Sequence, residues 1–538
     1  MRGKVVKVHF HLICRILKNI ILGSFWFVAA KSAMASQLVY CSEAYPPTLA
    51  PQMGTSMTTM NVGQHVFDSL LVQDPRTGEF SPSVAKTWSI SKDGLTYTFT
   101  LREDVAFHES EIFKPSRNLN ADDIVYTFQR MLDPKHPFHK VSGGNYSSFF
   151  GYGVNLSLKE VKKISPTTVQ FILKTPIAPL LTYLSFAGLG SLQSAEYADL
   201  AVKLKNLELV DKQPIGTGPF QLVKQQNEVN LRFKAFAKYF KGKAKFDDLI
   251  FSTVTEAAVR QQKLLAGECD VIFSPQFSDL PKFAANPKFK VHDSPGTNIF
   301  YLQMNAQKAP FDNPKVREAV AHSLNRENYV KAIYQGKAKV LNSLVPESFW
   351  SYIDGKSEFT YEPERARVLL KEAGFPNGFE TTLWALPVSR PYNPDGKKMA
   401  ELMQADLAKV GIKAKIVSYD WGTYLDKASK GEYDLYQIGT SEVLDPDAYY
   451  SYFTCQAVEM SDNTWCNKDF DKYLQLAKQV TDRKKRMAFY EKAFEVFKKD
   501  KPVVPIATGN IVQISSARVK SYAPGPDGSV DFYGSSVE

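Results

Sequence analysis

The first 35 residues constrain this chain more than any other segment, because they decide in which compartment it folds. Residues 2–18 carry five basic residues and no acidic one, and an apolar run at residues 20–30 follows. The small-residue site Ala33-Met34-Ala35 comes next. This order is typical of a cleavable secretory signal peptide, and the apolar run is shorter than the about 20 residues that span a bilayer. We expect cleavage after Ala35, with an uncleaved N-terminal anchor as the alternative.

Cysteine usage agrees with folding outside the cytosol. The predicted mature chain keeps four cysteines, namely Cys41, Cys269, Cys455 and Cys466. An even number of cysteines in an exported chain favours two disulfides, and the residues alone leave three pairings open. None of the four stands in a C-x-x-C pair or beside a histidine, so we predict no metal site.

Length and charge limit the remaining classes. Without the leader the chain has 503 residues, which is too many for one hydrophobic core, so we expect two or three lobes. Its formal charge falls from +10 to +4, because the leader holds six basic residues. No dense run of Lys and Arg with interleaved aromatic residues is present, so nucleic-acid binding is not predicted.

Strands and helices alternate along the whole mature chain. Alternating apolar residues predict strands, and apolar residues three and four positions apart predict helices. The expected strands are residues 37–40, 97–101, 168–173 and 412–417, and the expected helices are residues 121–131, 256–265, 314–324, 363–373 and 397–410, with a further helical region at 473–499. Asn120 is the expected N-cap of the first helix. The mixture indicates an α/β or α+β protein.

Four motifs spread along the chain match one family. They are WSISKDGLTYTFTLR at residues 88–102, LNADDIV at 119–125, PIGTGPF at 214–220 and NPKVREA at 313–319. On these motifs the chain resembles the peptide-type (family 5) extracellular solute-binding proteins of ABC transporters. Segments at residues 143–146, 390–394 and 445–447, together with the four cysteines, are similar to the dipeptide receptors of that family.

The resemblance implies an α/β fold, a two-lobed periplasmic-binding-protein clamshell of type II that is similar to cluster C. An extra subdomain is expected in the first lobe. That lobe would hold residues 36–295, after the signal peptide at 1–35, and be completed by residues 514–538. The second lobe would hold residues 296–513, and hinge closure would enclose a ligand in the cleft. The resemblance also implies the disulfides Cys41–Cys269 and Cys455–Cys466.

The function that the resemblance implies is capture rather than catalysis. A periplasmic receptor of this family takes up di- or short peptides and delivers them to the inner-membrane permease of an ABC importer. We therefore expect a monomer whose partners are a short peptide and a permease, with no cofactor, no metal and no nucleic acid. Haem, glutathione or an antimicrobial peptide on the same scaffold is the alternative.

A dipeptide is a zwitterion, so its site needs one fixed cation and one fixed anion. Burying either charge unpaired is strongly unfavourable. Arg390 is the expected cation, since it matches the family's carboxylate-binding arginine and its planar fork makes two parallel hydrogen bonds. Glu442 is the expected anion, because it stands where dipeptide receptors have an ammonium-binding Asp. The surrounding stretch 439–444 departs from the family pattern, so we expect the part of the site that binds the ligand ammonium to differ from that of the dipeptide receptors.

Five other residues complete the expected site. Trp421 matches an aromatic residue near the family's ligand and would form an apolar wall. Thr55, Ser56 and Met57 correspond to a segment of the first lobe that runs beside the peptide, and a flexible thioether can adapt to varied side chains. Asp445 is a second candidate anion, although its place in a turn favours capping of the local backbone.

Enzyme motifs are missing from the sequence. There is no G-x-S-x-G, no H-E-x-x-H and no Walker loop, and Gly216-Thr217-Gly218-Pro219 is interpreted as a turn. We therefore predict that the chain is not an enzyme. A secreted hydrolase is the least favoured alternative, because no nucleophile or metal constellation supports it.

Overall fold

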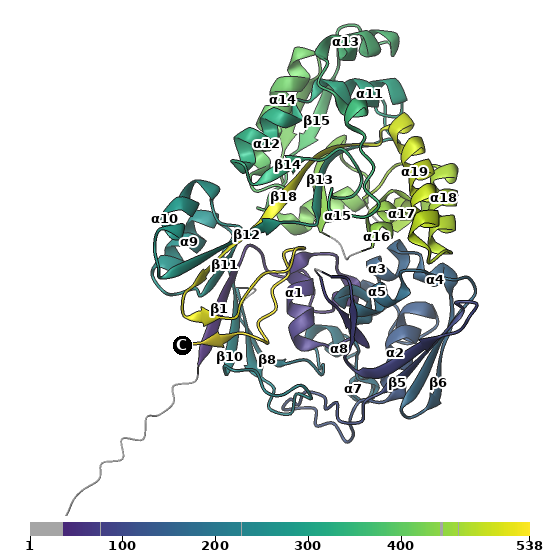
Figure 1. Ribbon diagram of the computed structural model, residues 1–538, viewed down its shortest axis with the longest axis vertical. Helices are drawn as coiled ribbons and strands as arrows, with labels where there is room; N and C mark the ends of the chain where they lie inside the picture. Colours follow the sequence, from purple (N-terminus) through teal and green to yellow (C-terminus); the bar gives the residue numbers. More distant parts are fainter. Residues whose placement is uncertain (1–35, 76, 227–228, 442–444, 461) are drawn as a thin grey trace, which may run out of the picture.

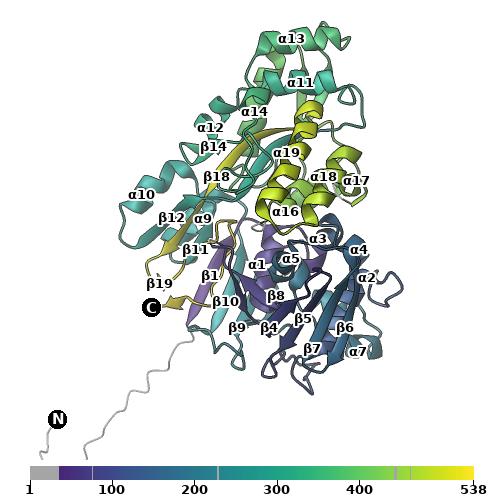
Figure 2. The same cartoon turned by 45° about the vertical axis from the view of Figure 1, so that its right-hand side comes forward.

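The computed structural model describes residues 36–75, 77–226, 229–441, 445–460 and 462–538. The predicted signal peptide and the candidate Glu442 lie outside these ranges. The described chain forms two bodies, a first lobe below and a second lobe above in Figures 1 and 2. None of the described helices is both long and apolar enough to cross a membrane.

The main part of the first lobe is a mixed sheet. Its strands, in spatial order, are β8 (Phe220–Gln226), β9 (Asn230–Ala235), β10 (Asp248–Thr253), β1 (Gln37–Ser42) and β11 (Val271–Phe273). β1 pairs in parallel with both β10 and β11. The helices here are α1 (Met57–Val66), α9 (Ala257–Leu265) and α10 (Leu280–Ala284). Cys41 in the central strand β1 is bonded to Cys269, two residues ahead of β11, which is the pairing that the resemblance implied.

An added subdomain extends the first lobe. Its antiparallel sheet has the order β4 (Ala85–Ile90), β5 (Thr96–Leu101), β7 (Thr168–Leu173) and β6 (Leu158–Ser165). The short pair β2 (Leu71–Gln73) and β3 (Phe80–Pro82) precedes it. Its helices are α2 (Ala121–Leu132), α3 (Ser147–Gly151), α4 (Val154–Ser157), α5 (Leu180–Ser185), α6 (Ala187–Gly190), α7 (Ala195–Lys203) and α8 (Leu209–Lys212).

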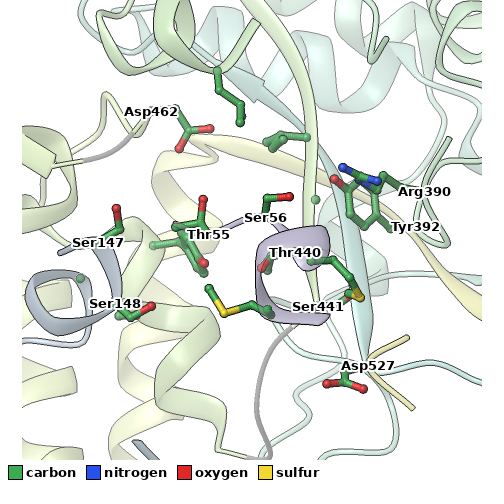
Figure 3. A pocket seen from close by; sticks show the side chains of 18 of the residues that line it. Thr55, Ser56, Ser147, Ser148, Arg390, Tyr392, Thr440, Ser441, Asp462 and Asp527 are labelled. Carbon is green, nitrogen blue, oxygen red and sulfur yellow. The ribbon is translucent and has the colours of Figure 1, made fainter. Parts of the chain in front are cut away.

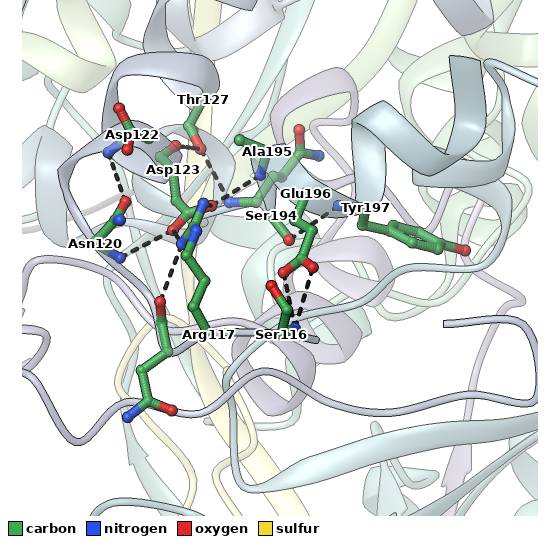
Figure 4. Close-up of polar contacts among 12 residues, drawn as sticks. Ser116, Arg117, Asn120, Asp122, Asp123, Thr127, Ser194, Ala195, Glu196 and Tyr197 are labelled. Atoms are coloured by element: carbon green, nitrogen blue, oxygen red, sulfur yellow. Dashed lines mark hydrogen bonds and ion pairs between the residues drawn. The ribbon is translucent and has the colours of Figure 1, made fainter. Parts of the chain in front are cut away.

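The family motif at residues 119–125 starts helix α2, as Figure 4 shows. The Asn120 side chain accepts the backbone N–H of Asp122 at 2.8 Å, so the predicted N-cap is confirmed. Asp123 accepts the backbone N–H of Asn120 in return, and it also binds Arg117 and the backbone N–H of Ala195. One buried carboxylate therefore caps α2 and ties it to the start of α7.

The second lobe has its own sheet and the largest apolar core. Its strands have the order β16 (Lys413–Val417), β15 (Glu380–Trp384), β17 (Leu435–Ser441), β13 (Asn298–Met304) and β18 (Val503–Ser516), with β14 (Ala338–Val340) also paired to β18. The helices are α11 (Pro314–Ser323), α12 (Arg326–Tyr334), α13 (Pro363–Glu372), α14 (Gly396–Lys409), α15 (Trp421–Ser429), α16 (Pro446–Tyr450), α17 (Cys455–Met460), α18 (Lys468–Lys478) and α19 (Arg483–Asp500). Every residue of β13 is buried, as expected for a strand covered on both faces.

Two segments carry the chain between the lobes. β12 (Phe289–Pro295) belongs to the first lobe and leads through Gly296 and Thr297 into β13 of the second. The 14-residue strand β18 pairs with β13 through residues 503–507 and with β11 through residues 513–515. The sheets of the two lobes are thus joined along β18 (Figure 1). The observed fold is the predicted α/β arrangement of two lobes with an extra subdomain.

Candidate ligand-binding site

A cavity of about 440 Å³ lies between the lobes. Its first-lobe wall includes Thr55, Ser56 and Met57 at the start of α1, and its second-lobe wall includes Arg390 and Trp421. Figure 3 shows several of these side chains around the open space. The structure therefore brings five of the seven predicted site residues to one cavity, whose size is that of a small-molecule site.

Arg390 is held rigidly in the loop between β15 and α14. Its backbone N–H donates to the Asn393 carbonyl at 3.1 Å, and the Asn393 N–H donates back at 3.0 Å. The side chain is 4% exposed and forms an ion pair with Glu43, which follows β1 in the first lobe. Its Nη2 is buried and has no hydrogen-bond partner among the described residues. Arg390 thus offers one unused donor at the cavity.

Trp421 supports the Arg390 guanidinium from one side. It is the first residue of α15, which the Asp420 side chain caps by accepting the Thr423 N–H. The guanidinium carbon lies 5.0 Å from the centre of the Trp421 ring, within the range of a cation–π contact. The indole Nε1 is buried and unpaired within the described chain. Trp421 therefore positions Arg390 and carries a second free donor.

The α1 segment forms the opposite wall. Ser56 is the N-cap residue of α1, and its hydroxyl lies 2.7 Å from that of Thr58. Met57 packs toward Gly528 in the C-terminal segment, where an added Cβ would lie 3.3 Å from the Met57 sulfur. The hydroxyls of Thr55 and Ser56 and the thioether of Met57 thus give this wall both polar and apolar surface.

Asp445 does not belong to the cavity, which corrects its place among the candidate anions. Both of its carboxylate oxygens accept from Arg486, at 2.7 and 2.9 Å. One of them also accepts the Asp447 N–H at 3.0 Å and so caps α16. The turn position next to Pro446 decides this role, because a short carboxylate there reaches the backbone two residues on.

Polar residues that the sequence did not single out lie in the cavity wall or directly behind it. Glu43 pairs with Arg390 across 347 residues, Tyr392 lies beside it, and Asp462 and Asp527 line the same space. Burial raises the pKa of Tyr392 to about 12, and the nearby Arg390 acts in the opposite direction. Glu43 lies just beyond the carboxyl end of β1, and open α/β sheets bind ligands at that edge. Its position after the first strand was therefore the sequence signal that could have identified it as a site residue.

A separate set of contacts closes the lobes on each other. The Tyr183 hydroxyl of the first lobe donates to the Asp447 carboxylate of the second at 2.6 Å. Lys478 reaches the same carboxylate at 3.2 Å and donates to the Tyr152 carbonyl at 2.8 Å. These bonds, together with the Glu43–Arg390 pair, hold the cavity closed. Among the described residues no three His, Cys, Asp or Glu side chains are grouped as a metal site.

Two lobes that close over a polar cavity are an arrangement found in periplasmic solute-binding proteins. The comparisons then give the family. Residues 79–460 match the model of bacterial extracellular solute-binding proteins, family 5 Middle, and the chain belongs to this family. The type II clamshell that the resemblance implied is confirmed by the solved structure of a related dipeptide-binding protein.

Three relatives indicate how similar the chain is to characterised members. The dipeptide-binding protein of Escherichia coli K12 is 41% identical over 95% of this chain and 96% of its own length. Heme-binding protein A of Haemophilus influenzae is 38% identical over 95% of this chain and 94% of its own. The crystal structure of a dipeptide-binding protein from Pseudoalteromonas sp. SM9913 in complex with Met-Leu superposes with a TM-score of 0.91 at 34% identity, covering 93% of this chain and 100% of that one.

Proposed function

We propose that this chain is the periplasmic substrate-binding component of an ABC importer and that it captures di- and short peptides between its lobes. The observation that carries the proposal is the buried, unpaired Nη2 of Arg390 at the cavity. A buried donor without a partner is unfavourable by about 1–3 kcal/mol, so a ligand that supplies an acceptor is stabilised there. A peptide carboxylate is such an acceptor, and its negative charge is complementary to the positive charge of the guanidinium.

Other unpaired polar atoms support a peptide rather than an apolar ligand. Trp421 Nε1 and Ser441 Oγ are buried in the same cavity and have no hydrogen-bond partner in the described part of the chain. A peptide has carbonyl and amide groups that can pair with both atoms. Met57 and Phe186 supply apolar surface for ligand side chains of different shapes.

The residue roles follow from these contacts. Arg390 would bind the ligand carboxylate, with Glu43 and Trp421 holding the guanidinium in place. Thr55, Ser56 and Met57 would run beside the peptide. Glu442 remains a candidate for the ligand ammonium on the strength of its sequence position. Asp445 has a structural role instead.

The remaining assignments are proposals of the same kind. The lobes would divide at residues 295/296 and 513/514, next to the β12–β13 connection and within β18. The protein would act as a monomer, deliver its ligand to an inner-membrane permease, and have no catalytic activity. Cleavage after Ala35 would leave Ser36, whose backbone nitrogen lies 3.1 Å from the Asp247 carboxylate, as the first residue.

A panel of ligands tests the proposal by thermal stabilisation of the purified mature protein. A ligand at about 100 times its dissociation constant adds about 2.7 kcal/mol of stability. We expect stabilisation by free dipeptides, including Met-Leu, and not by single amino acids. Haem is the second candidate, because a haem-binding relative is 38% identical and Met57 and Met60 line the cavity. Stabilisation by haem or glutathione and by no peptide would overturn the proposal.

A further inference from the structure

A carboxylate lies in the cavity wall away from Arg390. Three carboxylates are found among the described lining residues, those of Asp426, Asp462 and Asp527. Figure 3 shows Asp462 and Arg390 on different sides of the cavity, with Ser56 between them in the view. The cavity therefore has a fixed cation on one side and a carboxylate on another, which is the charge pattern of a zwitterionic ligand.

Two of the three carboxylates already have local partners. Asp426 forms an ion pair with Lys430, one turn along at 2.7 Å, and its side chain is 61% exposed. Asp527 accepts the backbone N–H of Ser529 at 3.0 Å and the Ser529 hydroxyl at 2.6 Å, which closes a turn. Both carboxylates are therefore satisfied before any ligand arrives.

Asp462 differs from Asp426 in having no counter-charge, and from Asp527 in that its carboxylate closes no turn of the described chain. No Lys, Arg or His of the described chain forms an ion pair with it, and its side chain is half-buried. Burial raises the pKa of this carboxyl, while its own backbone N–H and the Tyr436 hydroxyl act in the opposite direction. A cation that enters the cavity would be stabilised at this position, where water screens the charges poorly.

The backbone at Asp462 is fixed before ligand binding. Its carbonyl accepts from the Gln303 side chain at 2.7 Å and from the Tyr433 hydroxyl at 2.5 Å. Gln303 and Tyr433 are both buried in the second-lobe core. The disulfide Cys455–Cys466 closes the loop that carries Asp462. A carboxylate on a fixed backbone loses little conformational freedom on binding, which is what a charge-specific site requires.

We propose that Asp462 binds the ammonium group of the ligand, opposite Arg390 at the carboxylate. The inference rests on the proposed function and names the second charge that a buried zwitterion needs. It also explains how an amine end whose sequence departs from the family pattern at residues 439–444 can still hold a peptide. Because each added residue lengthens an extended peptide by about 3.3–3.6 Å, the two fixed charges would select ligands by length.

The experiment compares two probes, Met-Leu and N-acetyl-Met-Leu, by isothermal titration calorimetry of the mature protein. The variants are Asp462→Asn and Asp462→Ser, with Asp426→Asn and Asp527→Asn as matched controls from the same cavity. We expect Asp462→Asn to weaken Met-Leu binding roughly 30-fold or more, as for a buried charge pair that loses one partner. Its affinity for N-acetyl-Met-Leu, which has no ammonium group, should change less than about threefold.

Each other outcome decides against the assignment. Equal loss for both probes would mean that Asp462 supports the fold or the cavity shape and does not bind the ammonium. The same selective loss in Asp527→Asn, Asp426→Asn or Glu442→Gln, with Asp462→Asn unchanged, would place the anion elsewhere. Failure of the wild-type protein to bind Met-Leu would overturn both the proposed function and this inference. Met-Leu binding by the wild type that is unchanged in Asp462→Asn would overturn this inference alone.

Discussion

The buried pair of Arg390 and Glu43 permits a test that separates stability from binding. The two side chains are 4% and 1% exposed, so neither charge has water to replace its partner. Removing one partner of a buried ion pair destabilises a protein by about 3–5 kcal/mol, whereas replacing both by apolar residues is often neutral. We therefore predict that Arg390→Met and Glu43→Leu each lower the free energy of unfolding by that amount, and that the double variant recovers most of it.

Ligand binding should follow a different order from stability. Arg390→Met and the double variant both lose the carboxylate partner, and a buried charge contact that loses one side weakens binding by about 2–5 kcal/mol, or roughly 30-fold to several thousand-fold. Glu43→Leu keeps the guanidinium and removes its internal counter-charge. The ligand carboxylate then becomes the main partner of Arg390, so affinity for Met-Leu should be kept or increased.

Urea denaturation measures the first quantity and calorimetric titration with Met-Leu measures the second. Met-Leu amide, which has no carboxylate, provides the matched control and should bind the wild type and Arg390→Met about equally. The role of Arg390 in binding is refuted if the stable double variant binds Met-Leu as tightly as the wild type. It is also refuted if Glu43→Leu loses binding as completely as Arg390→Met does.

Three further predictions concern closure, the disulfide loop and pH. Tyr183→Phe removes a hydrogen bond between the lobes, which contributes about 1.5–3 kcal/mol because its acceptor is charged. Small-angle scattering should then show a larger radius of gyration, and calorimetric titration should show a weaker affinity. An unchanged radius and affinity would contradict a role of Tyr183 in closure. Replacing Cys455 and Cys466 by Ser opens a loop of sequence separation 11, and we expect the free energy of unfolding to fall by about 3 kcal/mol. Met-Leu binding should also weaken, because Asp462 lies in that loop. A loss of stability with intact affinity would argue against Asp462 as a ligand-binding residue. Burial lowers the pKa of His108 to about 4, so between pH 6.5 and 4 the unfolded chain binds more protons than the folded chain. The free energy of unfolding should therefore fall as the pH drops through that window, by up to about 1.4 kcal/mol per pH unit. His108→Gln should make this dependence less steep, and an equal dependence in the variant and the wild type would contradict the prediction.

Elements with local signals could be predicted closely from the sequence. The expected helix at 363–373 is α13, and the expected helix at 397–410 is α14. Both end just before a glycine that adopts a positive φ, at Gly374 and Gly411, which few other residues tolerate. The helical region 473–499 contains the end of α18 and most of α19. Its break depends on Asp482, which caps α19 by accepting the Lys485 N–H, and the apolar spacing continues through it.

A site residue could be predicted from the sequence only where one short segment contains both the residue and the motif that identifies it. Arg390 was recognisable because its motif, from Arg390 to Pro394, also builds the loop that positions it. Glu43 lies 347 residues away, and only the closed fold brings it to the guanidinium. The role proposed for Asp462 was equally hidden, because it depends on Gln303 and Tyr433 holding its backbone from other elements. Contacts between residues so far apart in the chain produce no motif or regular spacing by which the sequence alone could reveal them.

Calorimetric titration of the wild-type mature protein with Met-Leu tests the central claim most directly. The claim is that the cavity between the lobes binds a zwitterionic peptide through Arg390. We predict saturable binding of one Met-Leu per chain that is weakened by N-acetylation at one end and by amidation at the other. Saturation by haem with no heat change for Met-Leu or other dipeptides would contradict the claim.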